Sequence, residues 1–120
     1  TMSNENTTLG KIHVSPNAVA TIAYHATLRS YGVVGLASKN LASGLAQTIT
    51  KDPTRGVSVH YDENDKIDID IYVIVQHGTR IASVANSVAN TVRFNVEKAL
   101  GIRVNSIDVH VAGLRVGDGE

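Results

Sequence analysis

Hydrophobic and polar residues alternate most regularly over residues 67–75, which read Ile-Asp-Ile-Asp-Ile-Tyr-Val-Ile-Val. Successive side chains of a strand point to opposite faces, so the odd-numbered aliphatic residues share one face and Asp68 and Asp70 share the other. A carboxylate without a partner is costly to bury, so the second face is expected to meet water or a polar partner. Tyr72 and Ile74 make the end of the segment apolar on both faces. The pattern predicts a central strand in a sheet with one half-open face.

The spacing of apolar residues elsewhere predicts three helices and three further strands. Helices are expected from Pro16 to about Gly32, over 38–50, and from about Arg80 to Leu100, with an apolar link at 32–36 and a turn region at 51–56. Strands are expected over 10–15 and over 57–61. A last strand is expected to run to Ala112, with a bulge near Asn105 and Ser106. A polar loop at 62–66 joins two of the strands as a hairpin.

The order strand, helix, helix, strand, strand, helix, strand indicates the α+β class. We expect a two-layer sandwich in which a small mixed or antiparallel sheet carries helices on one face. Residues 10–112 are expected to form a single domain, between a disordered segment at 1–9 and a flexible, glycine-rich tail at 113–120.

Composition narrows the function classes. The 120-residue chain is 42 % hydrophobic, and its 11 basic and 11 acidic residues cancel, so no overall field attracts nucleic acid or anionic lipid. The absence of cysteine excludes disulfides, thiolate catalysis and cysteine-ligated zinc. The longest apolar run, Ile71 to Val75, is far shorter than the ~20 residues of a spanning helix, so no direct membrane span is predicted.

The outward positions of the predicted strands carry most of the candidate chemistry. Imidazoles and carboxylates there could ligate a transition metal, and two carboxylates could serve acid–base catalysis. Strand alternation produces a polar face in any half-open sheet, however, so we predict no catalytic residue, no cofactor and no metal. We expect this face to contact a partner instead. Its residues are His60, Asp68, Asp70, Tyr72, Asp108 and His110.

An alternative function rests on the segment Gly32-Val-Val-Gly35, which is predicted to join two helices after a first strand. This placement is typical of the GxxG loop with which KH domains clamp single-stranded nucleic acid. Such a clamp favours lysine or arginine between the glycines, whereas both residues here are valine. Nucleic acid is therefore the less favoured partner, and a metal-dependent activity of the aspartate and histidine face is a third interpretation.

Two stretches together resemble the alkaline shock protein family of Gram-positive bacteria, also called Gls-type general stress proteins. The first is Gly10-Lys-Ile-His-Val-Ser-Pro-Asn-Ala-Val-Ala-Thr-Ile-Ala, continued by Gly32-Val-Val-Gly-Leu. The second runs from Gly56-Val-Ser-Val through 67–78 and the long helix to Val104-Asn-Ser-Ile-Asp-Val-His-Val-Ala-Gly-Leu. The similarity covers nearly all of residues 10–115, and it rests on the order and spacing of these pieces.

The resemblance implies a cytoplasmic, non-enzymatic protein linked to cell-envelope homeostasis or to a stress response. Some relatives lie at the inner face of the membrane, held by a small membrane-embedded partner, and some self-associate. Others are encoded beside a kinase. The expected partners are therefore a membrane-embedded anchor protein, a neighbouring kinase or a second copy of the chain, and the family offers no catalytic residues to transfer.

Overall fold

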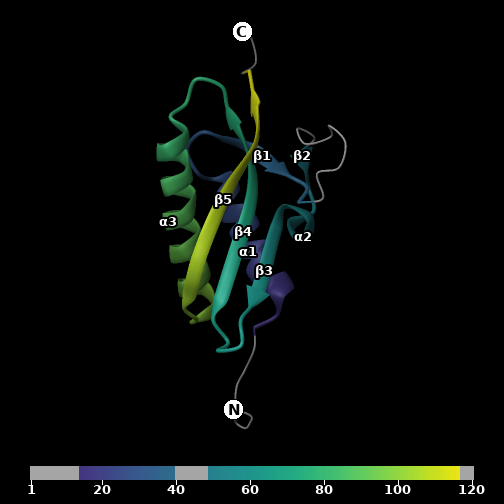
Figure 1. The fold of residues 1–120 in the computed structure, drawn as a ribbon, viewed down its shortest axis with the longest axis vertical. Helices are drawn as coiled ribbons and strands as arrows, with labels where there is room; N and C mark the ends of the chain where they lie inside the picture. Colours follow the sequence, from purple (N-terminus) through teal and green to yellow (C-terminus); the bar gives the residue numbers. More distant parts are fainter. Residues whose placement is uncertain (1–13, 40–48, 117–120) are drawn as a thin grey trace.

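The computed structural model describes residues 14–39 and 49–116. These residues form two layers, with a five-stranded sheet in one and the helices α1 and α3 packed together on one of its faces (Figure 1). The elements are α1 (Pro16–Leu28), β1 (Val33–Ala37), β2 (Ile49–Thr50), α2 (Pro53–Gly56), β3 (Val57–Tyr61), β4 (Ile67–Gln76), α3 (Ile81–Leu100) and β5 (Val104–Arg115). The predicted α+β class and the predicted placement of helices on one face are confirmed.

β4 is the central strand of the sheet. β5 runs parallel to β4 along its whole length. On the other side of β4, β3 pairs antiparallel with its first half and β1 pairs antiparallel with its second half, and β2 extends the sheet beyond β1. The sheet is thus mixed, and β3 and β5 both have an outer edge.

The core lies between the odd-numbered face of β4 and the inner stripe of α3. The isoleucines and valines of that face are at most 4 % exposed. Four α3 valines spaced four residues apart are fully buried against them: Val84, Val88, Val92 and Val96. Each such side chain contributes about 1.5–3 kcal/mol through burial. The buried stripe thus covers the middle of α3, whereas Ile81 at the start of the helix is 45 % exposed and Ala99 near its end is also exposed.

The helix ends follow local sequence signals. α1 begins where predicted, because the Ser15 hydroxyl accepts a hydrogen bond from the Asn17 N–H and Pro16 occupies the first helical position. α3 ends at Gly101, which has a φ of +67° and donates its N–H to the Glu97 carbonyl. This is the left-handed glycine cap expected at a helix C-terminus.

Several predicted elements differ from the structure. The link predicted at 32–36 is the strand β1, because its residues find partners in the second half of β4. The helix predicted over 38–50 is wrong at its C-terminal end, since Ile49 and Thr50 pair with β1 as β2, and its middle lies outside the described residues. The strand predicted over 10–15 lies mostly outside them too, and Val14 and Ser15 simply precede α1.

Smaller differences concern the turn and the last strand. The turn region predicted at 51–56 contains the single helical turn α2, which Asp52 caps by accepting from the Thr54 N–H. β5 continues to Arg115 rather than ending at Ala112, and the Arg115 carbonyl accepts from the His77 N–H. The predicted bulge is present, because the pairing skips Asn105 between Val104 and Ser106.

The turn between α1 and β1 gives a test of the packing around α3. Gly32 has a φ of +81°, and a Cβ added there would lie 2.6 Å from the Val84 side chain. Gly32→Ala is therefore expected to lower the free energy of unfolding by about 2–4 kcal/mol, through left-handed strain and overpacking together. Urea unfolding measures this change.

Gly101→Ala is the matched control, because Gly101 also has a positive φ but nothing within 4 Å of its added Cβ. It is expected to lose only the strain energy, about 1–2 kcal/mol. Equal losses for the two variants would contradict the tight packing of Gly32 against Val84.

Candidate functional site

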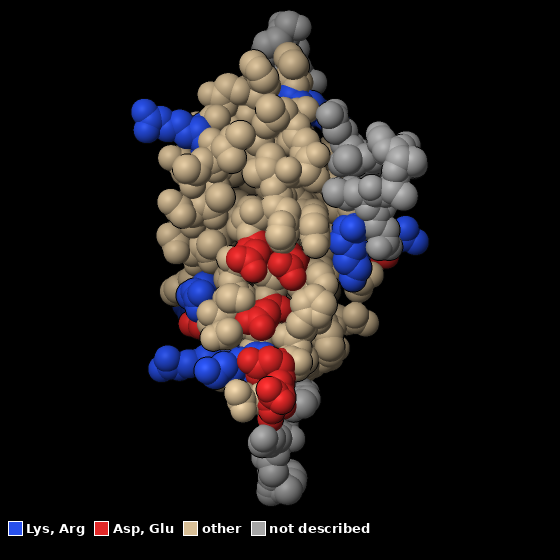
Figure 2. All heavy atoms as spheres, viewed as in Figure 1, with Lys and Arg blue, Asp and Glu red and all other residues tan. Residues whose placement is uncertain are grey.

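The candidate site is the sheet face that α1 and α3 leave uncovered. Figure 2 shows this face, with acidic side chains gathered where β3, β4 and β5 lie side by side. Pairing within the sheet sets Asp68 opposite His60, Asp70 opposite Asp108, and Tyr72 opposite His110. Paired residues point to the same face of a sheet, so the structure brings all six predicted residues together. We call these six residues the polar sheet face.

Asp70 is the centre of this face. Its Oδ1 lies 2.9 Å from the Nε2 of His110, and its Oδ2 lies 3.7 Å from the Nε2 of His60. The His60 Nε2 is also 2.9 Å from the Ser58 hydroxyl oxygen. Each contact between imidazole and carboxylate becomes an ion pair when the ring is protonated. Because both imidazoles are about half exposed or more, these pairs organise the surface more than they stabilise the fold.

A ring stack orients His110. The rings of Tyr72 and His110 lie nearly parallel, with an angle of 14° between their planes and 4.7 Å between their centroids. This stacking orients the imidazole, whose Nε2 lies 2.9 Å from Asp70 Oδ1. Tyr72 thus adds apolar area next to a polar cluster, a combination that favours protein–protein contacts.

The β5 bulge organises the other end of the face, around Asp68. A bulge places two successive residues opposite one residue of the partner strand. Here the Ser106 hydroxyl and the Asn105 amide both donate to Asp68 Oδ1, at 2.7 Å and 2.9 Å. These two hydrogen bonds hold the pKa of Asp68 below its ordinary value, and the bond from the Ser106 hydroxyl has the larger effect. The carboxylate therefore stays ionised in mildly acidic solution.

The arrangement gives little support to metal or acid–base chemistry. Within residues 14–39 and 49–116, no three histidine, aspartate or glutamate side chains are placed to hold a metal ion. The carboxylates lie on an open face rather than in a cavity, so a substrate placed there would not be shielded from water. The polar sheet face instead presents carboxylate hydrogen-bond acceptors next to the rings of tyrosine and histidine.

The glycine-based nucleic-acid clamp is not formed. Val33–Ala37 is a strand, so Gly32 to Gly35 is not a loop between two helices. Gly35 is buried within β1, where an added Cβ would lie 2.9 Å from the Ile49 side chain. Gly32 serves the turn before β1. The two glycines therefore serve folding and packing, and the KH-like interpretation was wrong about this segment.

Comparison with known proteins places the chain in a family. Residues 4–116 match the sequence model of the alkaline shock protein 23 (ASP23) family, which is described as having a cell envelope-related function. The chain belongs to the ASP23 family. The resemblance predicted from the sequence is confirmed, and it carries with it the family's cell envelope-related role.

Relatives in two bacterial species match along most of their length. The chain is 39 % identical to the protein YloU of Bacillus subtilis (strain 168), with 92 % of each chain covered. It is 31 % identical to YqhY of the same strain, over 95 % of this chain and 84 % of YqhY. Spy1614 of Streptococcus pyogenes serotype M6 is 29 % identical, over 92 % of this chain and 93 % of the relative.

Among solved structures, a MamM CTD variant in its zinc form is similar, with a TM-score of 0.49 and 18 % identity over 85 % of this chain and 89 % of that one. A likeness of this degree carries no functional argument. Within the described ranges of the ASP23-family chain, the helices are either too short or too polar to span a bilayer.

The hydrogen bonds to Asp68 predict a pH effect. A carboxylate whose pKa is lowered on folding stabilises the protein above its unfolded pKa, and that stabilisation is lost as the pH falls through the folded pKa. Ser106→Ala removes the first cause of the shift, so the pKa of Asp68 is expected to rise toward its ordinary value of 3.8. An NMR titration of the Asp68 side-chain carboxyl carbon measures the change.

Ser58→Ala is the control, because that hydroxyl contacts His60 rather than Asp68. It is expected to leave the titration of Asp68 nearly unchanged. An Asp68 pKa that does not move in Ser106→Ala would contradict the role assigned to the bulge.

Proposed function

We propose that this protein is a non-enzymatic interaction module of the cell envelope or its stress response, which acts by binding another protein through the polar sheet face. The observation that carries the proposal is the gathering of the six face residues on the sheet surface that α1 and α3 leave uncovered. The family's cell envelope-related role supports the setting.

The chemistry of the polar sheet face suggests how a partner would bind. Asp68 and Asp70 have their carboxylates held by neighbouring side chains, and the ring of Tyr72 is fixed by His110. Such a surface loses little conformational entropy when a partner covers it. Asp108 is exposed and adds negative charge to the face, so a partner with lysine or arginine side chains is favoured.

The location and the partner follow from the family resemblance. We propose that the protein is cytoplasmic and lies at the inner face of the cell membrane, where a small membrane-embedded protein holds it. A kinase encoded nearby is the alternative partner. Self-association through the sheet would use the same surface.

Capture of partners from the native bacterium tests the proposal. The tagged protein is expected to retain a specific envelope-associated protein, and Tyr72→Ala is expected to reduce its recovery about tenfold or more, as for a central interface anchor. Quantitative mass spectrometry of the captured material measures the recovery, and circular dichroism confirms that the variant is folded.

Tyr31→Ala is the matched control, because Tyr31 is a 66 % exposed tyrosine outside the polar sheet face. It is expected to leave the recovery unchanged. Equal recovery with Tyr72→Ala and wild type would remove the polar sheet face as the binding surface. Sedimentation over a wide concentration range tests self-association separately, and a strict monomer would exclude it.

A further inference from the structure

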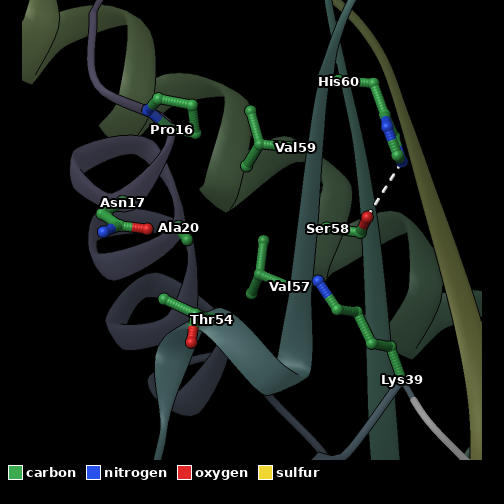
Figure 3. A pocket seen from close by; sticks show the side chains of 9 residues that line it. All are labelled: Pro16, Asn17, Ala20, Lys39, Thr54, Val57, Ser58, Val59 and His60. Atoms are coloured by element: carbon green, nitrogen blue, oxygen red, sulfur yellow. Dashed lines mark hydrogen bonds between the residues drawn. The ribbon is translucent and has the colours of Figure 1, made fainter.

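A second surface follows the outer edge of β3. A hollow of about 210 Å³ lies there, between the first turns of α1 and the strand (Figure 3). Val57 and Val59 point toward α1, whereas Ser58 and His60 point to the other side of the strand, and all four line the hollow. Since both faces of β3 contribute, the hollow runs along the edge of the strand rather than over one face.

The backbone at this edge has hydrogen-bonding groups to offer. In the hairpin that joins β3 to β4, the Asp62 N–H donates to the Lys66 carbonyl at 2.9 Å, so Asp62 faces β4. The direction of the backbone N–H and carbonyl groups alternates along an antiparallel strand. Those of Ser58 and His60 therefore also point to β4, whereas those of Val57 and Val59 point away from it. The Val57 N–H confirms this parity, because it donates to the Pro53 carbonyl of α2.

Val59 therefore lines the hollow with an N–H and a carbonyl that both point away from β4. In the part of the chain that the structure describes, β3 is the last strand on this side of the sheet, and no hydrogen bond from another element reaches the Val59 backbone. Such a donor and acceptor pair on one residue is what an added strand uses.

The charges around the hollow select the kind of strand. Among the residues that the structure describes, its lining includes Lys39 and no aspartate or glutamate. The imidazole of His60 also lines it, but this ring lies 3.7 Å from the Asp70 carboxylate of the polar sheet face.

Asp52, at the start of α2, accepts from the Thr54 N–H and hydroxyl and lies 3.6 Å from Arg55. The Thr54 hydrogen bonds are the first cause of its lowered pKa, and the charges of Arg55 and Lys39 contribute after them. Lys39 is therefore the cationic side chain that the described lining offers, and its exposed ammonium group complements a carboxylate.

We propose that the outer edge of β3, with Lys39 and the first turns of α1, binds an extended acidic segment of another protein as an added strand. Backbone hydrogen bonds to Val59 give the affinity, and a carboxylate next to Lys39 gives the selectivity. This site adjoins the polar sheet face at His60, but its binding groups are the Val59 backbone and the Lys39 side chain, and neither belongs to that face.

An NMR titration with a defined peptide tests the proposal. The probe is an acetylated and amidated peptide of alternating valine and glutamate, about six residues long, which is a typical strand length. It is expected to shift the amide signals of 57–60 and of the first turns of α1. The matched peptide, with lysine in place of glutamate, is expected to leave these signals unshifted.

Two variants identify the binding groups. Lys39→Glu is expected to weaken binding of the acidic peptide about three- to tenfold, because it reverses one exposed charge. Val59→Pro removes the outward N–H while leaving the pairing of β3 with β4, since proline is tolerated where a strand's N–H faces away from its neighbour, and it is expected to abolish the shifts. Lys98→Glu on α3 makes the same charge change away from the edge, and it should bind like wild type.

Three results would overturn the proposal: no shifts with the acidic peptide, equal shifts with the lysine peptide, or a Val59 amide already protected from hydrogen exchange without peptide. The last would mean that the chain itself or a second copy occupies the edge. Tyr72→Ala separates the two surfaces, because it should bind the peptide normally even though it loses the protein partner.

Discussion

The packing of the α3 valines against the odd-numbered face of β4 is the constraint on which the rest of the structure depends. It fixes which face of the sheet is covered. Because side chains alternate between the two faces of a strand, it also fixes the face on which each remaining side chain of β4 lies. Asp68, Asp70 and Tyr72 remain partly exposed because Ile67, Ile69 and Ile71 occupy the covered face. A one-residue slip would bury carboxylates against α3 without partners, which is far costlier than any surface contact they lose.

The bulge in β5 is what extends this face beyond β4. Val104 pairs with Ile67 on the covered side, so unbroken pairing would place Asp108 opposite Ile71, facing the helices. Skipping Asn105 reverses the parity, so that Asp108 pairs with Asp70 and His110 pairs with Tyr72. The same bulge brings Asn105 and Ser106 to Asp68. One inserted residue therefore both keeps a carboxylate out of the core and creates hydrogen bonds to another.

Sequence patterns predicted the elements whose periodicity is long or regular. α1 and α3, the hairpin of β3 and β4, and the β5 bulge were all anticipated, because apolar spacing and capping residues determine them locally. β1 and β2 were missed. β1 contains a bulge at Val34 and is buried on both faces over its last residues, so it shows no alternation, and β2 has only two residues. Short strands of this kind form because their neighbours offer backbone partners, which a local pattern does not contain.

The facing of the candidate residues was also predictable, but their mutual contacts were not. Parity alone places Asp70 and His110 outward, whereas the 2.9 Å contact between them requires the parallel register of two strands forty residues apart. The hydrogen bonds of Ser106 to Asp68 and the stacking of Tyr72 on His110 depend on that register in the same way. The outer edge of β3 could not be inferred at all, since a strand edge is defined by which other strands are present.

The outer edges of β3 and β5 differ in how they are protected, and the difference explains why β3 rather than β5 suits an added strand. At the start of β5, Glu97 accepts from the Val104 N–H at 2.9 Å and Arg93 donates to the Val104 carbonyl, so α3 engages both backbone groups there. Skipped residues at Asn105 and Ala112 then interrupt the regular edge. Both devices discourage edge-to-edge pairing. Between Val57 and His60, by contrast, β3 pairs in unbroken register and presents Val59 beside a hollow. β5 is a long strand with a blocked edge, and β3, on the other side of β4, is a short strand with an accessible edge. The sheet can therefore accept a partner strand along β3 without polymerising through β5.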